Sequence, residues 1–183
     1  GIMGEPLFLG VAFLDMEKVR FLADIRPAAL SATGADAVEF LISTNPGEEP
    51  KPIAKIASGG ELARIMLALK SVFADSFGVQ TVIYDEIDAG VSGKTARKIG
   101  IKLKTSARGT QTICVTHSAQ IASLADRQLL IEKRVIDGRT ETQVSEITGD
   151  DRVREIARIL GGVTVSETMR SSARELIDEG KNY

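Results

Sequence analysis

Two adjacent carboxylates follow a short apolar run near the middle of the chain. Residues Thr81–Tyr84 predict a buried strand, and Asp85 and Glu86 come directly after it. Ligands of parallel α/β sheets bind at the carboxyl ends of the strands. We expect Asp85 to hold a Mg²⁺ ion through water, and Glu86 to orient and deprotonate a water that attacks a phosphate. The alternative is that both acids merely cap the helix that follows.

A serine and two glycines precede a helical pattern earlier in the chain. Ser58, Gly59 and Gly60 stand before Glu61. Glycines let the backbone approach a phosphate closely, and the first N–H groups of the helix would point at it. Ser58 adds a hydroxyl donor, although a serine is also a common N-cap with no ligand. The segment predicts a phosphate contact only in combination with other signals.

His117 ends a second apolar run, Gln111–Thr116, and is the only histidine in the chain. We expect it at the same sheet edge as the two acids, where it could hydrogen-bond a γ-phosphate oxygen or the attacking water. A histidine satisfied by nearby backbone is the alternative. Without a second histidine or a cysteine cluster, a zinc site or a Ser-His-Asp triad has little support.

A segment just after the acids imitates a phosphate-binding P-loop. Residues Gly90–Thr95 include Gly-Lys-Thr, but the pattern G-x-x-x-x-G-K-[ST] needs glycine where Asp88 stands. The segment also follows the acidic strand rather than a strand of its own. We therefore expect the chain to lack a Walker A motif.

The remaining elements position these groups in an α/β fold, expected as a mostly parallel sheet flanked by helices plus a small antiparallel pair. Apolar runs without alternation, separated by helices, predict parallel strands that are covered on both faces. The other predicted elements are strands at Val19–Ile25 and Ala37–Ser43, a helix with apolar positions at Leu62, Ile65, Met66, Leu69, Val72 and Phe73, helices at Ser92–Ala107 and Ser118–Ala125, the pair Leu129–Val135 and Thr142–Ile147, and two final helices separated by Gly161-Gly162.

Composition limits the classes of function. The 183 residues suit one domain, aromatic residues make up 4% with no Trp, and the formal net charge is −2. These values argue against a stacking platform for single strands and against an overall basic surface. Any DNA contact must come from a local patch or from other parts of a larger protein. The lone Cys114 and the absence of a long apolar stretch predict a soluble, intracellular chain.

Four elements then occur in the order and spacing of an ABC-type ATPase: signature, acidic strand, D-loop at Ile87–Gly90, and histidine. The chain resembles the RecN family of bacterial SMC-like DNA repair ATPases over roughly residue 17 to the end. The matching segments include Val38–Ser43, Ala57–Lys70, Asp85–Gly93, Val115–His117 and Glu155–Gly162. Residues 1–16 are expected to be a tag or a coiled-coil remnant, and 17–183 the C-terminal lobe of an ATPase head.

The resemblance implies a role for each candidate residue. Asp85 is the Mg²⁺ ligand, Glu86 the catalytic base and His117 the switch histidine. The signature residues Ser58, Gly59, Gly60 and Glu61 would act in trans on ATP held by a second head, and Asp88 would couple the two sites. One departure from the family is Ser118-Ala119, where Leu-Pro is expected after the histidine.

The resemblance also implies cofactors and partners. ATP and Mg²⁺ would bind between two heads, each completed by an N-terminal lobe that carries Walker A. The full-length protein would act on DNA in recombinational repair of double-strand breaks, in the cytoplasm at the nucleoid and without a membrane. Two alternatives are an ABC-transporter cassette, which usually has proline where Ile87 stands, and a non-catalytic interaction module.

Overall fold

The computed structural model describes residues 18–55, 62–70, 78–136, 138–162 and 164–183. The predicted boundary at residue 17 and the signature residues 58–61 lie outside these ranges. The elements in chain order are β1 (Arg20–Ser31), β2 (Gly34–Ser43), β3 (Lys51–Pro52), η1 (Ile53–Lys55), β4 (Thr81–Asp85), α3 (Gly93–Ser106), β5 (Gln111–Val115), α4 (Ala119–Ala122), β6 (Gln128–Ile136), β7 (Arg139–Ile147), α5 (Gly149–Gly161) and α6 (Glu167–Gly180). Residues 62–70 are also helical.

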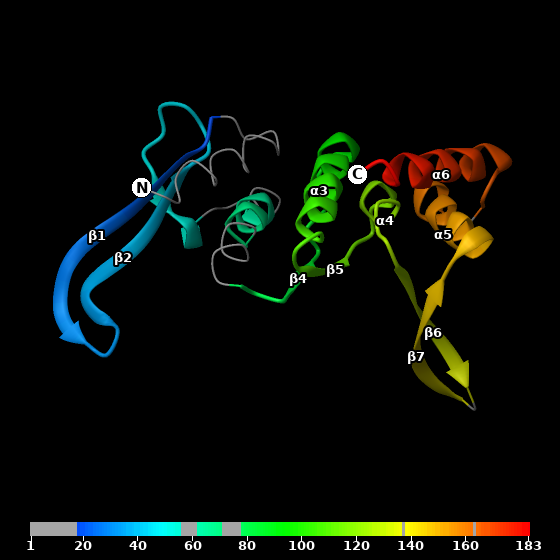
Figure 1. Cartoon of the computed structure of the whole chain (residues 1–183), viewed down its shortest axis with the longest axis horizontal. Coiled ribbons are helices and arrows are strands. Elements are labelled where there is room, and N and C mark those ends of the chain that lie inside the picture. The colour runs from blue at the N-terminus through cyan, green and yellow to red at the C-terminus, as the bar shows by residue number, and fades with distance from the viewer. Residues whose placement is uncertain (1–17, 56–61, 71–77, 137, 163) are drawn as a thin grey trace.

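Two β-hairpins lie at opposite ends of the molecule, with β4, β5 and α3 between them (Figure 1). The first hairpin pairs β1 with β2 antiparallel, and β3 adds a short third strand. Both long strands extend beyond the predicted segments, to a turn at Gly34, whose φ of 124° suits only glycine. The register shifts between Pro27 and Ser31, because proline has no N–H to donate to the ladder.

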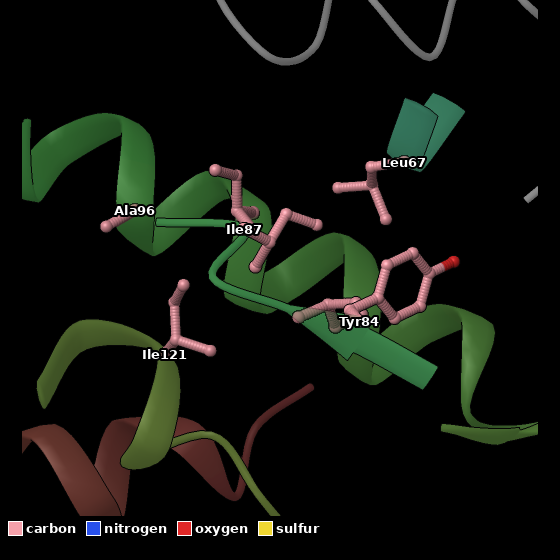
Figure 2. Packing of buried hydrophobic residues seen from close by; sticks show 7 residues of the cluster. Leu67, Tyr84, Ile87, Ala96 and Ile121 are labelled. Carbon is pink, nitrogen blue, oxygen red and sulfur yellow. The ribbon is translucent and has the colours of Figure 1, made fainter. Parts of the chain in front are cut away.

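The helix at 62–70 is buried on two sides. Ile65 and Leu69 pack against the first hairpin, whereas Leu67 packs against Tyr84 of β4 (Figure 2). The predicted apolar face is confirmed at Ile65 and Leu69, while Met66 is exposed. The predicted positions Val72 and Phe73 lie outside the described residues. Leu67 does not belong to the predicted face, and its burial links this helix directly to the strand that carries the acids.

β4 and β5 form the predicted parallel pair. Alternate residues of the pair face α3, where Val82, Tyr84 and Cys114 meet the cluster around Ile99 of α3. The opposite face carries Ile83, which is 58% exposed, with Ile113 and Val115 beside it. The sequence predicted that both faces of this strand pair are covered. In the described part of the chain only the face toward α3 is covered, because no described helix packs on the other face.

The C-terminal third combines a hairpin with two helices. β6 and β7 pair antiparallel as predicted, turning at Gly138 with a φ of 78°. α5 ends at Gly161, and Gly162, whose φ is 79°, follows as the predicted stop signal. α5 and α6 pack on α4 through a cluster of small and aliphatic residues that includes Ile156 and Ala173. The helix expected at 118–125 is only four residues long.

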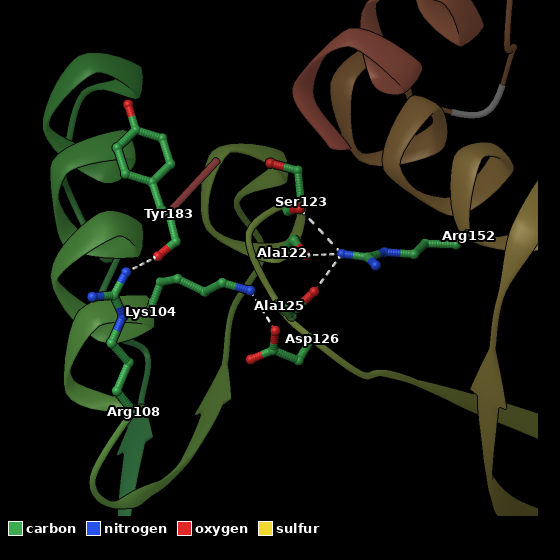
Figure 3. A network of polar contacts seen from close by, with 8 residues as sticks. All are labelled: Lys104, Arg108, Ala122, Ser123, Ala125, Asp126, Arg152 and Tyr183. Atoms are coloured by element: carbon green, nitrogen blue, oxygen red, sulfur yellow. Dashed lines mark hydrogen bonds and ion pairs between the residues drawn. The ribbon is translucent and has the colours of Figure 1, made fainter. Parts of the chain in front are cut away.

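One arginine holds the end of α4 in place. Arg152 Nη2 donates to the carbonyl oxygens of Ser123 at 3.1 Å and Ala125 at 2.7 Å, with Ala122 at 3.5 Å (Figure 3). The last carbonyls of a helix have no partner within the helix. Burial lowers the pKa of Arg152 from its ordinary value.

Within the described ranges, no helix has the length and apolar character needed to cross a bilayer.

Candidate functional site

The parallel register of β4 and β5 sets the site geometry. Asp85 stands opposite Val115 as the last pair of the ladder. Glu86 therefore leaves the sheet at the same edge as Thr116 and His117. The side chains of Asp85, Glu86 and His117 are all exposed there. The structure thus brings together the three residues that the sequence predicts to act on one phosphate.

Glu86 has a strained backbone. Its φ is 51°, and it is the only described residue other than glycine with a positive φ. This conformation costs a side chain about 1–2 kcal/mol. The turn is closed by a hydrogen bond from Ala89 N to Glu86 O at 3.0 Å, and Ile87 is buried at 3% exposure in the core beneath it (Figure 2). Strain of this kind persists where the surroundings impose it, often at functional sites.

Asp88 ties the turn after β4 to the segment after β5. Its Oδ2 accepts a hydrogen bond from the Thr116 hydroxyl at 2.7 Å and another from His117 N at 2.9 Å. The Thr116 hydroxyl in turn accepts from Ser118 N at 3.0 Å. Because Asp88 holds the histidine by its main chain, the imidazole can turn to a ligand. The backbone direction of His117 is thus set by Asp88 in the turn after β4.

Thr116 is not among the residues that the sequence predicts for the site. Its type and position give a signal: a hydroxyl at the end of a buried strand can bond both a carboxylate and a nearby backbone N–H. Only the structure identifies Asp88 as its partner, because the two residues are far apart in the sequence.

The charge at this edge is negative. The pKa of Cys114 is raised to about 12, first by burial and then by the charges of Asp88 and Asp85. The thiol is therefore neutral at ordinary pH and unreactive. A negative edge next to exposed carboxylates attracts a divalent cation.

The donor set fits Mg²⁺ rather than a metal held by protein alone. Among the described residues, no group of three or more His, Cys, Asp and Glu side chains lies close enough to cage a metal. Mg²⁺ keeps several waters and usually takes one or two carboxylates plus substrate phosphates. The carboxylate of Asp85 suits that requirement, since it is exposed at the end of β4.

The P-loop-like segment is held by hydrogen bonds within the chain. Ser92 caps α3 by accepting a hydrogen bond from Thr95 N at 3.5 Å, and Val91 N donates to Asp88 O at 3.2 Å. Asp88 itself turns toward Thr116. Asp88 thus occupies the first position of the P-loop pattern, and its carboxylate already accepts a hydrogen bond.

The predicted signature residues 58–61 lie outside the described part, but the helix after them is fixed on β4. Lys70 Nζ donates to Ile83 O at 3.2 Å and lies 5.2 Å from the centre of the Tyr84 ring. Leu67 packs on the same ring. The helix at 62–70 and β4 therefore form one packed unit.

Comparison with solved structures defines the class. The SMC head domain with coiled coil and joint from Pyrococcus yayanosii matches with a TM-score of 0.65 at 20% identity, over 84% of this chain and 28% of that one. The SMC head with an extended coiled coil from Pyrococcus furiosus matches with a TM-score of 0.58 at 20% identity, over 86% of this chain and 36% of that one. The fold is that of the C-terminal lobe of an SMC-type head.

Comparison of sequences defines the family. No protein-family model matches the chain. The DNA repair protein RecN of Halalkalibacterium halodurans is 44% identical over 170 residues, covering 90% of this chain and 30% of that protein. The chain belongs to the RecN family, and it spans about 30% of the length of this relative.

Proposed function

We propose that the chain is the C-terminal half of the ATP-hydrolysing head of an SMC protein that acts in recombinational repair of DNA double-strand breaks. The observation that carries the proposal is the β4–β5 edge, where Asp85, Glu86 and His117 lie exposed and Asp88 fixes the main chain of His117. The relatives are DNA repair proteins, so the transporter alternative is not favoured.

Each residue has a part in hydrolysis. ATP with Mg²⁺ supplies a γ-phosphate whose charge the metal neutralises. Asp85 would hold the metal, and Glu86 would orient and deprotonate the attacking water. His117 donates to the γ-phosphate or to that water. Ser58, Gly59, Gly60 and Glu61 close over ATP held by a second head, and Asp88 couples that contact to His117.

The uncovered sheet face supports a missing lobe. Ile83, Ile113 and Val115 form an apolar surface opposite α3, and apolar strands of a parallel pair are normally covered on both sides. We propose that the N-terminal lobe, which carries Walker A, covers this face. The complete protein would form an ATP-dependent dimer of heads, bind DNA, and work in the cytoplasm at the nucleoid.

Head dimerisation tests this proposal. In the full-length protein, Ser58→Arg should leave ATP binding by single heads intact but prevent ATP-dependent dimerisation, measured by size-exclusion chromatography with light scattering. Ser171→Arg, at an exposed serine of α6 in the same lobe, is the control for the added charge. Dimerisation that survives Ser58→Arg would show that the signature does not act in trans.

The chain without its N-terminal lobe should bind ATP poorly and hydrolyse almost none. Turnover by the chain alone, abolished by Glu86→Gln, would instead assign phosphate binding to Gly93, Lys94 and Thr95.

A further inference from the structure

Positive charge is concentrated on α3 and the turn after it. Residues 93–110 contain six cationic residues and no acidic one, in a chain whose net charge is −2. The cationic residues are Lys94, Arg97, Lys98, Lys102, Lys104 and Arg108. A local basic patch is what a chain with this overall charge needs in order to contact a polyanion.

Three of these residues, on one flank of α3, form polar contacts with other segments of the chain. Arg97 pairs with Glu179 at 3.0 Å, and Lys104 pairs with Asp126 (Figure 3). Arg108 Nη2 donates to the carbonyl oxygen of Tyr183 at 2.5 Å (Figure 3). These contacts tie α3 to the C-terminal helix and to the loop before β6, so half of the basic residues have a structural role.

The remaining three lysines of α3 form a second stripe. Lys94, Lys98 and Lys102 follow one another at intervals of four residues, outside the face that buries Ala96 and Ile99. Lys94 is exposed, and the other two are partly exposed. Neither Lys94 nor Lys102 forms an ion pair with any described residue, whereas Lys98 has an interaction of its own within the protein.

We propose that Lys94 and Lys102, at the two ends of this stripe, bind the phosphate backbone of duplex DNA. Eight residues of helix extend about 12 Å, and one strand of a duplex presents one phosphate per 3.4 Å of axis, so about three phosphates fall within reach. Stacking on single strands is disfavoured, since the chain has no Trp and only 4% aromatic residues. The inference rests on the proposed function for its choice of DNA as the polyanion.

The salt dependence of DNA binding tests the stripe. In the full-length protein, Lys94→Gln/Lys102→Gln should weaken binding of a fluorescently labelled duplex by about tenfold at low salt. The slope of log K against log salt concentration should fall by about two, one for each phosphate that a lysine no longer neutralises. Fluorescence anisotropy over a salt series measures both. Lys94→Arg/Lys102→Arg should restore the affinity and the slope, because the charge is kept.

Matched controls separate this inference from a general charge effect. Lys51→Gln/Lys133→Gln removes two exposed lysines from β3 and β6 and should keep wild-type DNA affinity. An equal drop in affinity in this control would overturn the proposal. Unchanged DNA binding by Lys94→Gln/Lys102→Gln would also overturn the proposal. If that variant bound DNA normally but lost affinity for polyglutamate, the stripe would bind an acidic protein.

The failure of this inference is distinguishable from the failure of the proposed function. Lys94→Gln/Lys102→Gln should hydrolyse ATP at the wild-type rate without DNA, which also shows that the variant is folded. Glu86→Gln should bind DNA with the wild-type salt slope. If the lysine variant loses DNA binding while Glu86→Gln still hydrolyses ATP normally, the stripe stands and the catalytic assignment fails.

Discussion

Two residues at the β4–β5 edge, Glu86 and His117, are held through their main chains and not through their side chains. Glu86 is fixed in a left-handed conformation above the buried Ile87, and His117 is fixed through its N–H to Asp88. Both side chains consequently remain exposed to a ligand. The strain at Glu86 is maintained by the packed turn, which aims the carboxylate without restricting its chemistry.

The Thr116 hydroxyl is predicted to position His117. Thr116→Val removes the hydrogen bond to Asp88 and leaves Ser118 N without its acceptor, while preserving the shape of the side chain. Loss of about 1.4 kcal/mol of positioning would slow ATP turnover by about tenfold. Steady-state kinetics of the full-length protein should show the loss in kcat with little change in KM.

Thr116→Ser is the control for this prediction, because it keeps the hydroxyl and should retain most of the activity. Equal kcat values for Thr116→Val and the wild type would show that Asp88 holds His117 without the hydroxyl.

At the scale of secondary-structure elements, polar contacts hold the short helix α4 in place. α4 is only four residues long, too short to be stable by itself. Arg152 of α5 satisfies the carbonyls at its end (Figure 3). α4 begins two residues after His117, so the arginine helps to fix the segment that carries the histidine.

Arg152→Ala is predicted to destabilise this segment. Buried carbonyls would lose a charged donor, at a cost of about 2 kcal/mol. Hydrogen–deuterium exchange of the full-length protein should then accelerate by about thirtyfold in peptides covering α4 and the start of β6, if these amides exchange by local opening.

Arg134→Ala is the matched control, since it removes only a solvent-exposed ion pair with Glu132 and should leave the exchange nearly unchanged. Equal exchange in α4 for Arg152→Ala and the wild type would show that packing alone holds the helix.

The sequence predicted the elements that rely on local signals. The parallel strands, the antiparallel β6–β7 pair and the stop at Gly162 are confirmed, because apolar runs and glycines determine them locally. The sequence did not predict the hydrogen bond between Thr116 and Asp88, or the burial of Leu67 on a second side of the helix at 62–70. Both depend on contacts between segments far apart in the chain, which periodicity does not encode. The roles of the site residues remain predictions.

At the scale of the whole molecule, the described part of the chain is not closed around one core. Its hairpins lie at opposite ends of the structure (Figure 1), and the buried residues of the described ranges fall into three separate clusters. Ile83 on the outer face of β4 is 58% exposed, and Leu129 and Ile131 on β6 are each 59% exposed. A two-stranded hairpin with apolar residues open to solvent is marginally stable alone. This arrangement suits a lobe that is completed by the rest of a head.

The most direct test of the central claim is the rate of ATP hydrolysis by full-length Glu86→Gln. The substitution keeps the size of the side chain but removes the base, so turnover should fall by about 10²–10⁴-fold, while ATP still binds and the dimer of heads accumulates. Glu175→Gln, at an exposed glutamate on α6, should hydrolyse at the wild-type rate. Wild-type turnover by Glu86→Gln would contradict the assignment of the β4–β5 edge as a catalytic site.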